Sequence, residues 1–450
     1  MDDFWTVSAF RGLGYSLDRY GSSSIPERVR AEGEDGMHPG RVGDLTDVVC
    51  PPFDVIGERD RAALLERDER NAVRLELSAA PDPYGTAASE LARWRGDGTL
   101  ALQPEPRAYY YAHATSSAPN RLSVHGIAVR VLLESWGARV RPHERTLHGP
   151  KKDRLALLRS TATQFSPILA IYFDRSARYR HVMSRAWTDE WRARDADGLL
   201  HQLAAVEADA RLLGYLARQQ LFIADGHHRY ETALAYRDEV RSTPPHRDAP
   251  RGTLAADWVM AVLVNAEEEA VEIRPTHRLI RGIDAEVVAA LPDRLADRWD
   301  AVPVSAEEVA KRLGDLDGET RPVVGLVLPG GRGYVLLGRP DALDERLRSE
   351  RIGIAARHLD LTAVHATVFQ DVLGIDVSGE AAGERLIYTK DADDAIARVA
   401  RGDADAALLV RATPLHQLAA VARAGDVMPQ KATYFHPKLL TGLVFNPLED

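Results

Sequence analysis

The sequence predicts a mixed α/β protein of the α+β class with more than one domain. Its 450 residues are enough for two or three domains. Short apolar runs typical of buried strands, such as Trp258–Asn265, alternate along the chain with segments of helical periodicity, such as Thr86–Asp97. Hydrophobic residues make up 45% of the chain, which is ordinary for a globular protein and allows a sizeable core.

Composition restricts the partners and the compartment. The chain has 57 Lys and Arg against 67 Asp and Glu, a net charge of −10, so nucleic acid is not an expected partner without a local basic patch. Cys50 is the only cysteine, which excludes an intrachain disulfide and fits a reducing compartment. No apolar run approaches the roughly 20 residues that span a bilayer, and the first residues do not resemble a signal peptide. We expect a cytoplasmic protein without a membrane partner.

The N-terminal third shows both kinds of element. Glu58–Arg70 and Thr86–Asp97 have the pattern of helices. Asn71–Leu77 alternates between polar and apolar residues, which predicts a half-buried strand. Arg107–His113 and Leu122–Leu133 are expected to form two antiparallel strands, because a polar, turn-like segment separates them.

Residues 142–159 (PHERTLHGPKKDRLALLR) are dense in charge, with Gly149-Pro150 separating a loop from a helix. Lysines at a helix start oppose the helix dipole, so an anion nearby would explain them. The alternative is a solvated charged face. The candidate site residues of this stretch are His143, Glu144, Arg145, Lys151, Lys152 and Arg154.

The stretch Leu221–Val240 (LFIADGHHRYETALAYRDEV) carries the clearest chemistry. Four apolar residues predict a buried strand, Asp225-Gly226 a turn, and the following residues a helix. This geometry binds phosphate, since amide groups and the positive end of the helix dipole point at one spot. Gly226 allows close approach, and His227, His228 and Arg229 add donors. The alternative is an ordinary turn with surface histidines; a metal site on adjacent histidines is not expected, because their side chains point apart.

The C-terminal half predicts a separate lobe. A composition shift near Asp284 opens an α+β lobe over residues 284–385, after a core over residues 1–283. Residues 386–450, with strands at Leu386–Thr389 and Ala406–Val410, are expected to dock back on the core. Near the end, Lys431 and Lys438 lie among aromatics and prolines and could close over a site. The alternative there is a C-terminal strand with incidental lysines.

Four motifs in one order support a family resemblance. PPFDVI (51–56), PHERTLHGPKKDRLALLR (142–159), ADGHHRYETAL (224–234) and MPQKATYFHPK (428–438) resemble the bacterial and archaeal family known as domain of unknown function ten-fifteen. The chain departs from that family's pattern at Phe53, where Tyr is usual, and at Ala432, where Ser is usual. Each change removes a hydroxyl, so neither position is assigned a catalytic role.

The DGHHR segment also resembles the phosphate-binding motif of the ParB/sulfiredoxin superfamily, which includes partition proteins, sulfiredoxins and free-serine kinases. The resemblance implies a ParB/sulfiredoxin-like nucleotide-binding core in which Asp225, Gly226, His227, His228 and Arg229 line a phosphate site. Sulfiredoxins carry a reactive cysteine in this loop. The corresponding residue here is His227, so reduction of a sulfinic acid is not expected.

These observations predict a small-molecule phosphotransferase that moves a phosphoryl group from ATP or ADP, with Mg²⁺, to serine or a similar hydroxylated metabolite. Asp225 would hold Mg²⁺ or accept a proton, His227 would act beside it, and Glu144 is the candidate general base. Lys151, Lys152 and Arg154 would neutralise the transferring oxygens. Candidates for the cleft wall are His143, Arg145, Asp54, Lys431 and Lys438.

Two other functions remain open. One is a regulatory or partition-like protein that binds or hydrolyses a nucleotide, although the acidic charge and the lack of a helix-turn-helix pattern count against DNA binding. The other is a module that holds a phosphorylated metabolite without turnover. The sequence leaves the oligomeric state open. The kinase hypothesis makes one structural prediction, that Asp225–Arg229 and His143–Arg154 line one cleft.

Overall fold

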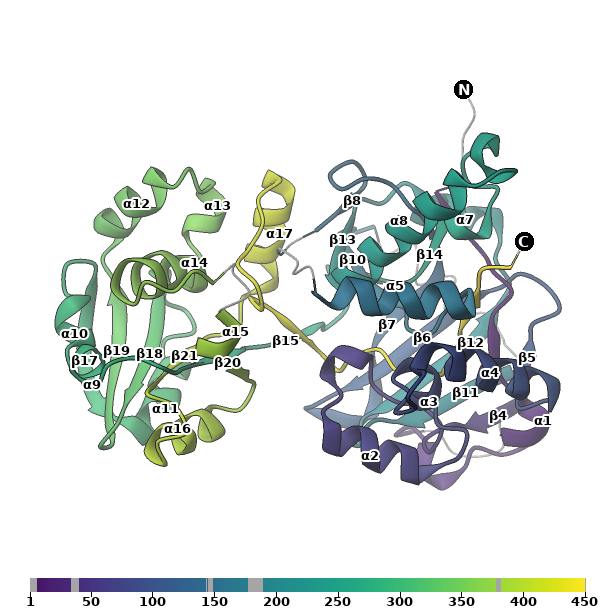
Figure 1. Ribbon diagram of the computed structural model, residues 1–450, viewed down its shortest axis with the longest axis horizontal. Helices are drawn as coiled ribbons and strands as arrows, with labels where there is room; N and C mark the ends of the chain where they lie inside the picture. Colours follow the sequence, from purple (N-terminus) through teal and green to yellow (C-terminus); the bar gives the residue numbers. More distant parts are fainter. Residues whose placement is uncertain are drawn as a thin grey trace. The chain divides into compact units, whose positions relative to one another are not determined.

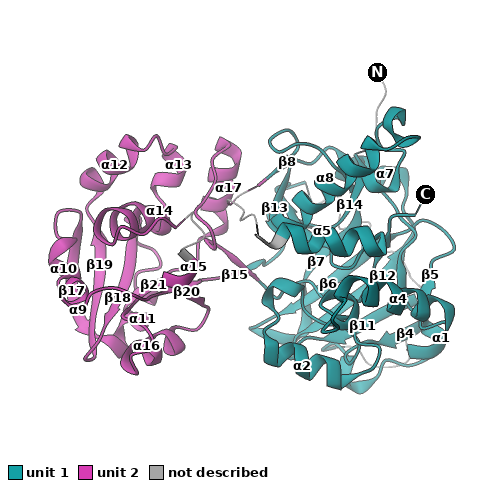
Figure 2. Ribbon diagram, in the orientation of Figure 1, with its two compact units in different colours: residues 1–141, 147–272, 436–450 teal, residues 142–146, 273–435 magenta. Residues whose placement is uncertain are grey.

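The computed structural model describes residues 6–33, 40–142, 144, 149–176, 189–377 and 382–449. The chain divides into two compact units (Figure 2). Unit 1 comprises residues 1–141, 147–272 and 436–450, and unit 2 comprises residues 142–146 and 273–435. These bounds differ from the predicted divisions at 283/284 and 385/386.

Unit 1 is built on one large mixed sheet with the strand order β3-β4-β11-β12-β6-β7-β14-β10-β13-β8 (Figure 1). Neighbouring strands are antiparallel except for β4 with β11, β14 with β10, and β13 with β8. In sheet order the strands are β3 (Gly21–Ser22), β4 (Arg41–Asp44), β11 (Asp189–Arg194), β12 (Leu200–Val206), β6 (Ala108–Thr115), β7 (Ala118–Leu132), β14 (Trp258–Asn265), β10 (Ile168–Tyr172), β13 (Leu221–Asp225) and β8 (Val140–Arg141), with β1 (Val7–Ser8) on β7.

The apolar runs of the sequence form the middle of this sheet. Every residue of β14, β10 and β6 is buried, as their composition predicts. The antiparallel pairing expected for the two strands around residues 107–133 is that of β6 with β7. A mixed α/β fold with a large central sheet is therefore confirmed.

The helices of unit 1 include the pair that positions the candidate site. In this pair α5 (Gly149–Thr161) packs against α8 (His227–Ser242), and α8 also packs on β10 and β14 (Figure 1). The other α-helices in the described part of unit 1 are α1 (Leu17–Tyr20), α2 (Glu58–Arg67), α3 (Val73–Glu76), α4 (Pro83–Gly96) and α7 (Ala210–Ala217).

The strand predicted for Asn71–Leu77 is wrong, because these residues form α3. Asn71 is buried, and its Oδ1 accepts a hydrogen bond from the backbone N–H of Val73. Its Nδ2 donates to the carbonyl oxygens of Asp47 and Val49. Asparagine side chains that bond nearby backbone favour turns and helix starts over strands.

Unit 2 has an antiparallel sheet with the order β17-β19-β18-β21-β16-β20. Its strands are β17 (Trp299–Ser305), β19 (Arg332–Gly338), β18 (Val323–Leu328), β21 (Ala406–Val410), β16 (His277–Ile280) and β20 (Leu386–Thr389). Its helices are α9 (Ala285–Ala289), α10 (Leu291–Arg294), α11 (Val309–Gly314), α12 (Pro340–Ser349), α13 (Ile354–Arg357), α14 (Asp360–Val364), the π-helix η6 (His365–Val372), α15 (Ala382–Arg385), α16 (Ala392–Ala400) and α17 (Leu415–Ala424).

The pairing of β16 explains why the unit boundaries differ from the prediction. β16 precedes the predicted lobe, yet it pairs with β20 and β21, which follow that lobe. These contacts join residues more than a hundred positions apart, so no local pattern reveals them. The strands at Leu386–Thr389 and Ala406–Val410 were located correctly, but they complete the sheet of unit 2.

Only the last part of the C-terminal segment belongs to unit 1. The chain passes between the units within β15 (Glu272–Arg274) and β22 (Tyr434–His436). After β22, Thr441 forms a bridge with Cys50, and β23 (Asn446–Pro447) pairs with β9 (Thr163–Gln164). Elsewhere in unit 1, β2 (Leu13–Tyr15) pairs with β5 (Leu100–Leu102).

None of the helices in the described part of the chain combines the length and the apolar character needed to cross a membrane.

Candidate functional site

The turn between β13 and α8 requires glycine. Gly226 has φ = 94° and immediately precedes the first residue of α8. A Cβ atom at this position would lie 2.4 Å from Cγ2 of Ile168. The positive φ and the close approach both exclude a side chain, so the sequence must place glycine here. The strand, turn and helix predicted for Leu221–Val240 are present.

The N-terminus of α8 supplies the backbone half of an anion site. The first amide groups of a helix have no intrahelical acceptor, and the helix dipole places partial positive charge beside them. Within the described residues, no side chain caps this end of α8. His227 is buried in the first turn, and His228 and Arg229 are partly buried beside it. Helix ends of this kind bind phosphate groups.

An ion cluster lies directly on the turn. Nζ of Lys438 donates to Oδ1 of Asp225, and Nη2 of Arg229 donates to Oδ2 of the same carboxylate. Burial alone would raise the pKa of Asp225, but the charges of Lys438 and Arg229 outweigh burial and hold that pKa well below its usual value. Asp225 is therefore ionised at neutral pH and holds two cations beside the N-terminus of α8.

Arg229 is held in one orientation. Its Nη1 donates to the carbonyl oxygen of Pro167 while its Nη2 contacts Asp225. A bidentate grip on phosphate by Arg229, as the sequence predicts, would compete with these two bonds. What Arg229 offers in the present arrangement is a fixed positive charge, which with Lys438 gives two charges against one on Asp225.

A cavity of about 60 Å³ adjoins this cluster within unit 1. The hydroxyl of Thr232 lies in its wall, is buried, and makes no hydrogen bond within the described residues. A buried hydroxyl without a partner indicates that something else, such as a ligand or water, completes its bonding. The polar residues lining the cavity are Glu76, Arg154, Thr163, Gln164, Ser166, Arg229 and Thr232.

Glu76 is the buried carboxyl group of this cavity, with 4% of its surface exposed. Oγ of Ser166 donates to its Oε1 at 3.1 Å, and the hydroxyl of Thr441 lies 2.5 Å from the same Oγ. Burial raises the pKa of Glu76 above its usual value, because the opposing charges of Arg154 and Arg229 do not fully offset it. A carboxyl group with a raised pKa in a cavity is a candidate for acid–base chemistry.

Arg154 lines the same cavity and forms an ion pair with Glu76, with Nη1 3.6 Å from Oε1. Its Nη1 donates to the backbone carbonyl of Glu76 at 2.7 Å, and its Nε donates to Oδ2 of Asp153 at 2.7 Å. Its guanidinium lies over the ring of Phe53, 4.3 Å from the ring centre. Arg154 and Arg229 thus line the same cavity, so this part of the predicted convergence is present in unit 1.

The arrangement of Phe53, Arg154, the Asp225–Arg229 loop and Lys438 uses residues from all four motifs of the sequence. The family model described as "Protein of unknown function (DUF1015)" matches residues 35–362. The chain belongs to the DUF1015 family. No curated protein matches it. The expected family membership is therefore confirmed.

Solved structures align with this DUF1015 protein only distantly. A mutant free serine kinase in complex with AMP is 14% identical, covers 68% of this chain and 87% of its own, and has a TM-score of 0.36. A conserved hypothetical protein from Pyrococcus furiosus is 13% identical, with coverage of 69% and 92% and a TM-score of 0.35. SbnI with a C-terminal truncation, from Staphylococcus aureus, is 11% identical, with coverage of 69% and 84% and a TM-score of 0.35.

The other predicted site residues of unit 1 differ in how they relate to the cavity that contains Glu76. Lys151 forms an ion pair with Glu231 of α8, so it links the two helices that flank the cavity. Lys152 is exposed on α5. Asp54 is also exposed, yet its charge contributes to the raised pKa of Glu76, which places it near the cavity.

Two predicted site residues belong to unit 2. Glu144 forms a bridge with Met428 and interacts electrostatically with buried Arg278. Lys431 is exposed, and its backbone carbonyl accepts a hydrogen bond from Arg278 at 2.9 Å. The structure therefore gives Glu144 a partner of its own in unit 2, and its role as a general base stays a prediction. His143 and Arg145 lie outside the described residues.

The carboxylate of Asp225 does not fit a magnesium ligand in this arrangement. Both of its oxygens already contact cationic nitrogens, which a metal ion would have to displace. Within the described ranges, no group of three or more His, Cys, Asp or Glu side chains could hold a metal ion. We therefore assign no protein ligand to Mg²⁺ among these residues.

Sequence reasoning missed Glu76, Ser166 and Thr441. Glu76 was hidden because its segment alternates like a strand, which would have placed its side chain on a solvated face. One feature of the sequence could have indicated Glu76. It is a charged residue between two leucines, Leu75 and Leu77, and it follows the PPFDVI motif and the helix after it. Ser166 and Thr441 lie far apart in the sequence, and only the fold brings their hydroxyls to Glu76.

Proposed function

We propose that unit 1 is a nucleotide-dependent phosphotransferase that acts on a small hydroxylated metabolite, with the nucleotide phosphates at the N-terminus of α8. The observation that carries this proposal is the pairing of two fixed cations, Arg229 and Lys438, at a helix N-terminus beside a cavity that holds the buried carboxyl of Glu76. Phosphoryl transfer needs charge neutralisation and positioning more than covalent chemistry.

The phosphates would be bound by backbone and side chains together. The amide groups of the first turn of α8 would donate to phosphate oxygens, and Gly226 allows them to come close. Lys438 and Arg229 would neutralise charge that builds up on the oxygens during transfer. His227 and His228 lie in the same turn and would add donors. ATP or ADP would serve as the phosphoryl donor.

The acceptor hydroxyl would enter the 60 Å³ cavity. That volume holds a few water-sized groups, so it admits the reacting end of a small acceptor such as serine. The acceptor oxygen forms a bond to the terminal phosphorus, the bond from that phosphorus to the bridging oxygen breaks, and Glu76 takes the hydroxyl proton. The products are a phosphomonoester and the nucleotide shortened by one phosphate. Ser166 and Thr441 would hold Glu76 in place.

Phosphorus NMR tests the proposal directly. The full chain is incubated with ATP or ADP, with and without Mg²⁺, and with a pool of hydroxylated amino acids and metabolites. We expect a new phosphomonoester signal, and we expect Glu76→Gln to lower its rate by about 100-fold or more, because general-base catalysis contributes that much. Glu144→Gln tests the other candidate base, and this variant should keep the wild-type rate if Glu76 is the base.

The other possible results of this experiment would support different functions or a different base. Release of inorganic phosphate alone would favour a nucleotide-driven regulatory protein, and binding without turnover by the folded protein would favour a phosphometabolite-binding module. Loss of activity in Glu144→Gln but not in Glu76→Gln would transfer the role of base to Glu144. Thermal unfolding of both variants separates loss of chemistry from loss of fold.

A further inference from the structure

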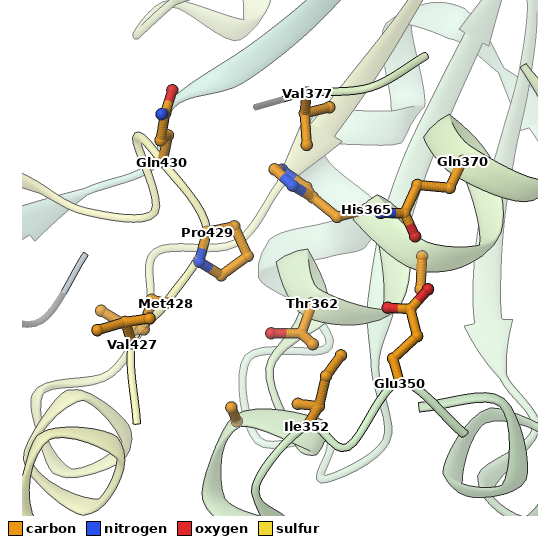
Figure 3. A pocket seen from close by; sticks show the side chains of 12 residues that line it. Glu350, Ile352, Thr362, His365, Gln370, Val377, Val427, Met428, Pro429 and Gln430 are labelled. Carbon is orange, nitrogen blue, oxygen red and sulfur yellow. The ribbon is translucent and has the colours of Figure 1, made fainter. Parts of the chain in front are cut away.

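Unit 2 contains a second cavity, which lies outside the proposed catalytic unit. Its volume is about 170 Å³, and we call it the Thr362 cavity (Figure 3). A cavity of about 150 Å³ is large enough to bind benzene, so this one has room for an organic ring. Its lining includes Glu350, Ile352, Thr362, His365, Gln370 and Met428.

The wall of the cavity is mostly apolar. Ile352 lies on one side, and Met428 and Pro429 lie on the segment facing it (Figure 3). An apolar wall favours a ligand with an apolar body, because its burial removes apolar surface from water. Ile354 is the first residue of α13 and lies between Ile352 and Ala356 in the sequence. Its side chain is 72% exposed, so an apolar surface faces solvent next to the lining residues in the chain.

One polar group inside the cavity lacks a partner. Thr362 is only 5% exposed, and its Oγ1 makes no hydrogen bond within the described residues. Its oxygen points to the side where Met428 and Pro429 lie (Figure 3). A buried hydroxyl left unpaired costs about 1–3 kcal/mol, so its presence in the wall of a cavity indicates that a bound molecule completes its bonding.

The π-helix η6 brings further polar side chains to the same wall. His365 and Gln370 are five residues apart, and in an α-helix they would point about 140° away from each other. In a π-helix, whose hydrogen bonds join residues five apart, both can line one cavity, and both do. His365 is held edge-to-face against Phe369, with ring centres 5.3 Å apart. π-helical turns occur frequently at functional sites.

The charges at the rim are balanced. Glu350 accepts a hydrogen bond from Nη2 of Arg346 at 2.7 Å, and the same Arg346 pairs with Asp371 at 2.8 Å. Asp371 also pairs with Arg298 at 3.0 Å, so two arginines stand against two carboxylates. The rim therefore offers no net charge to attract an ionic ligand. The lining combines apolar side chains with polar groups, and its carboxylate, Glu350, is paired with Arg346, in contrast to the excess of positive charge around Asp225.

We propose that the Thr362 cavity binds an uncharged organic molecule of about one ring, which exchanges a hydrogen bond with the hydroxyl of Thr362. The ring packs against Ile352 and Met428, and its polar group lies toward Thr362 and His365. This site is separate from the phosphate site of unit 1, so the two proposals can fail independently.

Methyl NMR with phenol as the probe tests this site. Phenol has one ring and one hydroxyl, and the full chain labelled with ¹³C in its methionine methyl groups reports on Met428. We expect a saturable shift of the Met428 signal with millimolar phenol, while the signal of buried Met260 in unit 1 stays constant. The variant Met428→Leu identifies the signal. Benzoate, which carries a charge, should produce no shift at the same concentrations.

Two variants make the test specific. Thr362→Val keeps the shape of the side chain but removes the hydroxyl, and we expect phenol affinity to fall by about fivefold to tenfold while benzene affinity is unchanged. Ala366→Leu fills the cavity and should abolish binding of both. The absence of a saturable Met428 shift would overturn the proposal. So would equal phenol affinity in the wild-type protein and Thr362→Val.

Discussion

The cavities of the two units differ in the charged groups that lie beside them. In unit 1, Asp225, Arg229 and Lys438 form a cluster of charges whose members hold one another in place. In unit 2, the Thr362 cavity is larger and its rim charges are balanced. Each cavity has a buried threonine hydroxyl, Thr232 in unit 1 and Thr362 in unit 2, that makes no hydrogen bond within the described residues. A preorganised charge cluster suits a ligand that brings charge, and an apolar cavity with one unpaired hydroxyl suits a neutral ligand. The two proposed sites would therefore select their ligands by different physics.

The largest effect on stability is expected from Asp225→Asn. This change removes the counter-charge of Lys438 and Arg229, and breaking a buried ion pair in this way costs about 3–5 kcal/mol in the free energy of unfolding. Inorganic phosphate should restore part of the loss, because it supplies negative charge at the same place. Urea denaturation with and without phosphate measures both effects.

Asp54→Asn is the control for that prediction, since Asp54 is exposed and its removal should change stability by no more than about 0.5 kcal/mol. If phosphate stabilised Asp54→Asn and Asp225→Asn equally, it would be acting away from the Asp225 loop. The proposed preference of the unit 1 site for charged ligands would then lose its support.

A smaller effect is expected from Gly226→Ala. The substitution places a Cβ at φ = 94° and 2.4 Å from Ile168, so backbone strain and a steric clash add to about 2–4 kcal/mol. Gly98→Ala is the matched control in unit 1, because Gly98 has φ = 75° but no atom within 4 Å of its added Cβ. It should cost only the strain, about 1 kcal/mol. Equal costs for the two variants would show that the close approach at Gly226 is not important.

The dependence of stability on pH should differ in sign between the two carboxyl groups of unit 1. The lowered pKa of Asp225 stabilises the fold above the usual value of 3.8, and this stabilisation is lost as the pH falls. The raised pKa of Glu76 has the opposite effect, because stability is greatest below the usual value of 4.5 and declines as the pH rises through the raised pKa.

Unfolding curves over a pH series measure this difference. Glu76→Gln should become progressively more stable than the wild-type protein as the pH rises above 4.5. The deficit of Asp225→Asn should shrink as the pH falls below 3.8. A stability difference between Glu76→Gln and the wild-type protein that did not change with pH would argue against a buried, titrating Glu76.

The smallest effect is expected in unit 2. Thr362→Val replaces an unpaired buried hydroxyl with a methyl group, so we expect a gain of about 1 kcal/mol in the absence of ligand. Thermal unfolding of the ligand-free protein measures it. Thr367→Val is the control, because its hydroxyl accepts from Trp299 and donates to Ala363, and it should be destabilised instead. Destabilisation of both variants would mean that Thr362 is satisfied by the protein itself.

Local patterns predicted the strand and turn around Asp225 well, because apolar runs and a glycine with positive φ leave direct traces in the sequence. The run Trp258–Asn265 is a strand with the predicted bounds. Glu76 could not be found in this way, since the side chain of Asn71 bonds distant backbone and turns an alternating segment into a helix.

Long-range pairing limited the rest of the prediction. Lys431 and Lys438 are seven residues apart in one motif, yet the boundary between the units falls between them. Only Lys438 reaches Asp225, whereas Lys431 belongs to unit 2. Met428, Pro429 and Gln430 of the Thr362 cavity open the fourth family motif, but the sequence did not predict a cavity there, because a π-helix and an unpaired hydroxyl leave no local signature.

Calorimetric titration of ADP and ATP into the full chain tests the central claim, that Lys438 and Arg229 at the N-terminus of α8 bind nucleotide phosphates. Lys438→Met keeps the aliphatic stem but removes the charge, and loss of a charge-assisted hydrogen bond should weaken nucleotide binding by about 10- to 100-fold. Lys431→Met, the control in unit 2, should bind like the wild-type protein. Equal affinity in Lys438→Met and the wild-type protein, or no nucleotide binding by the folded chain, would contradict the account.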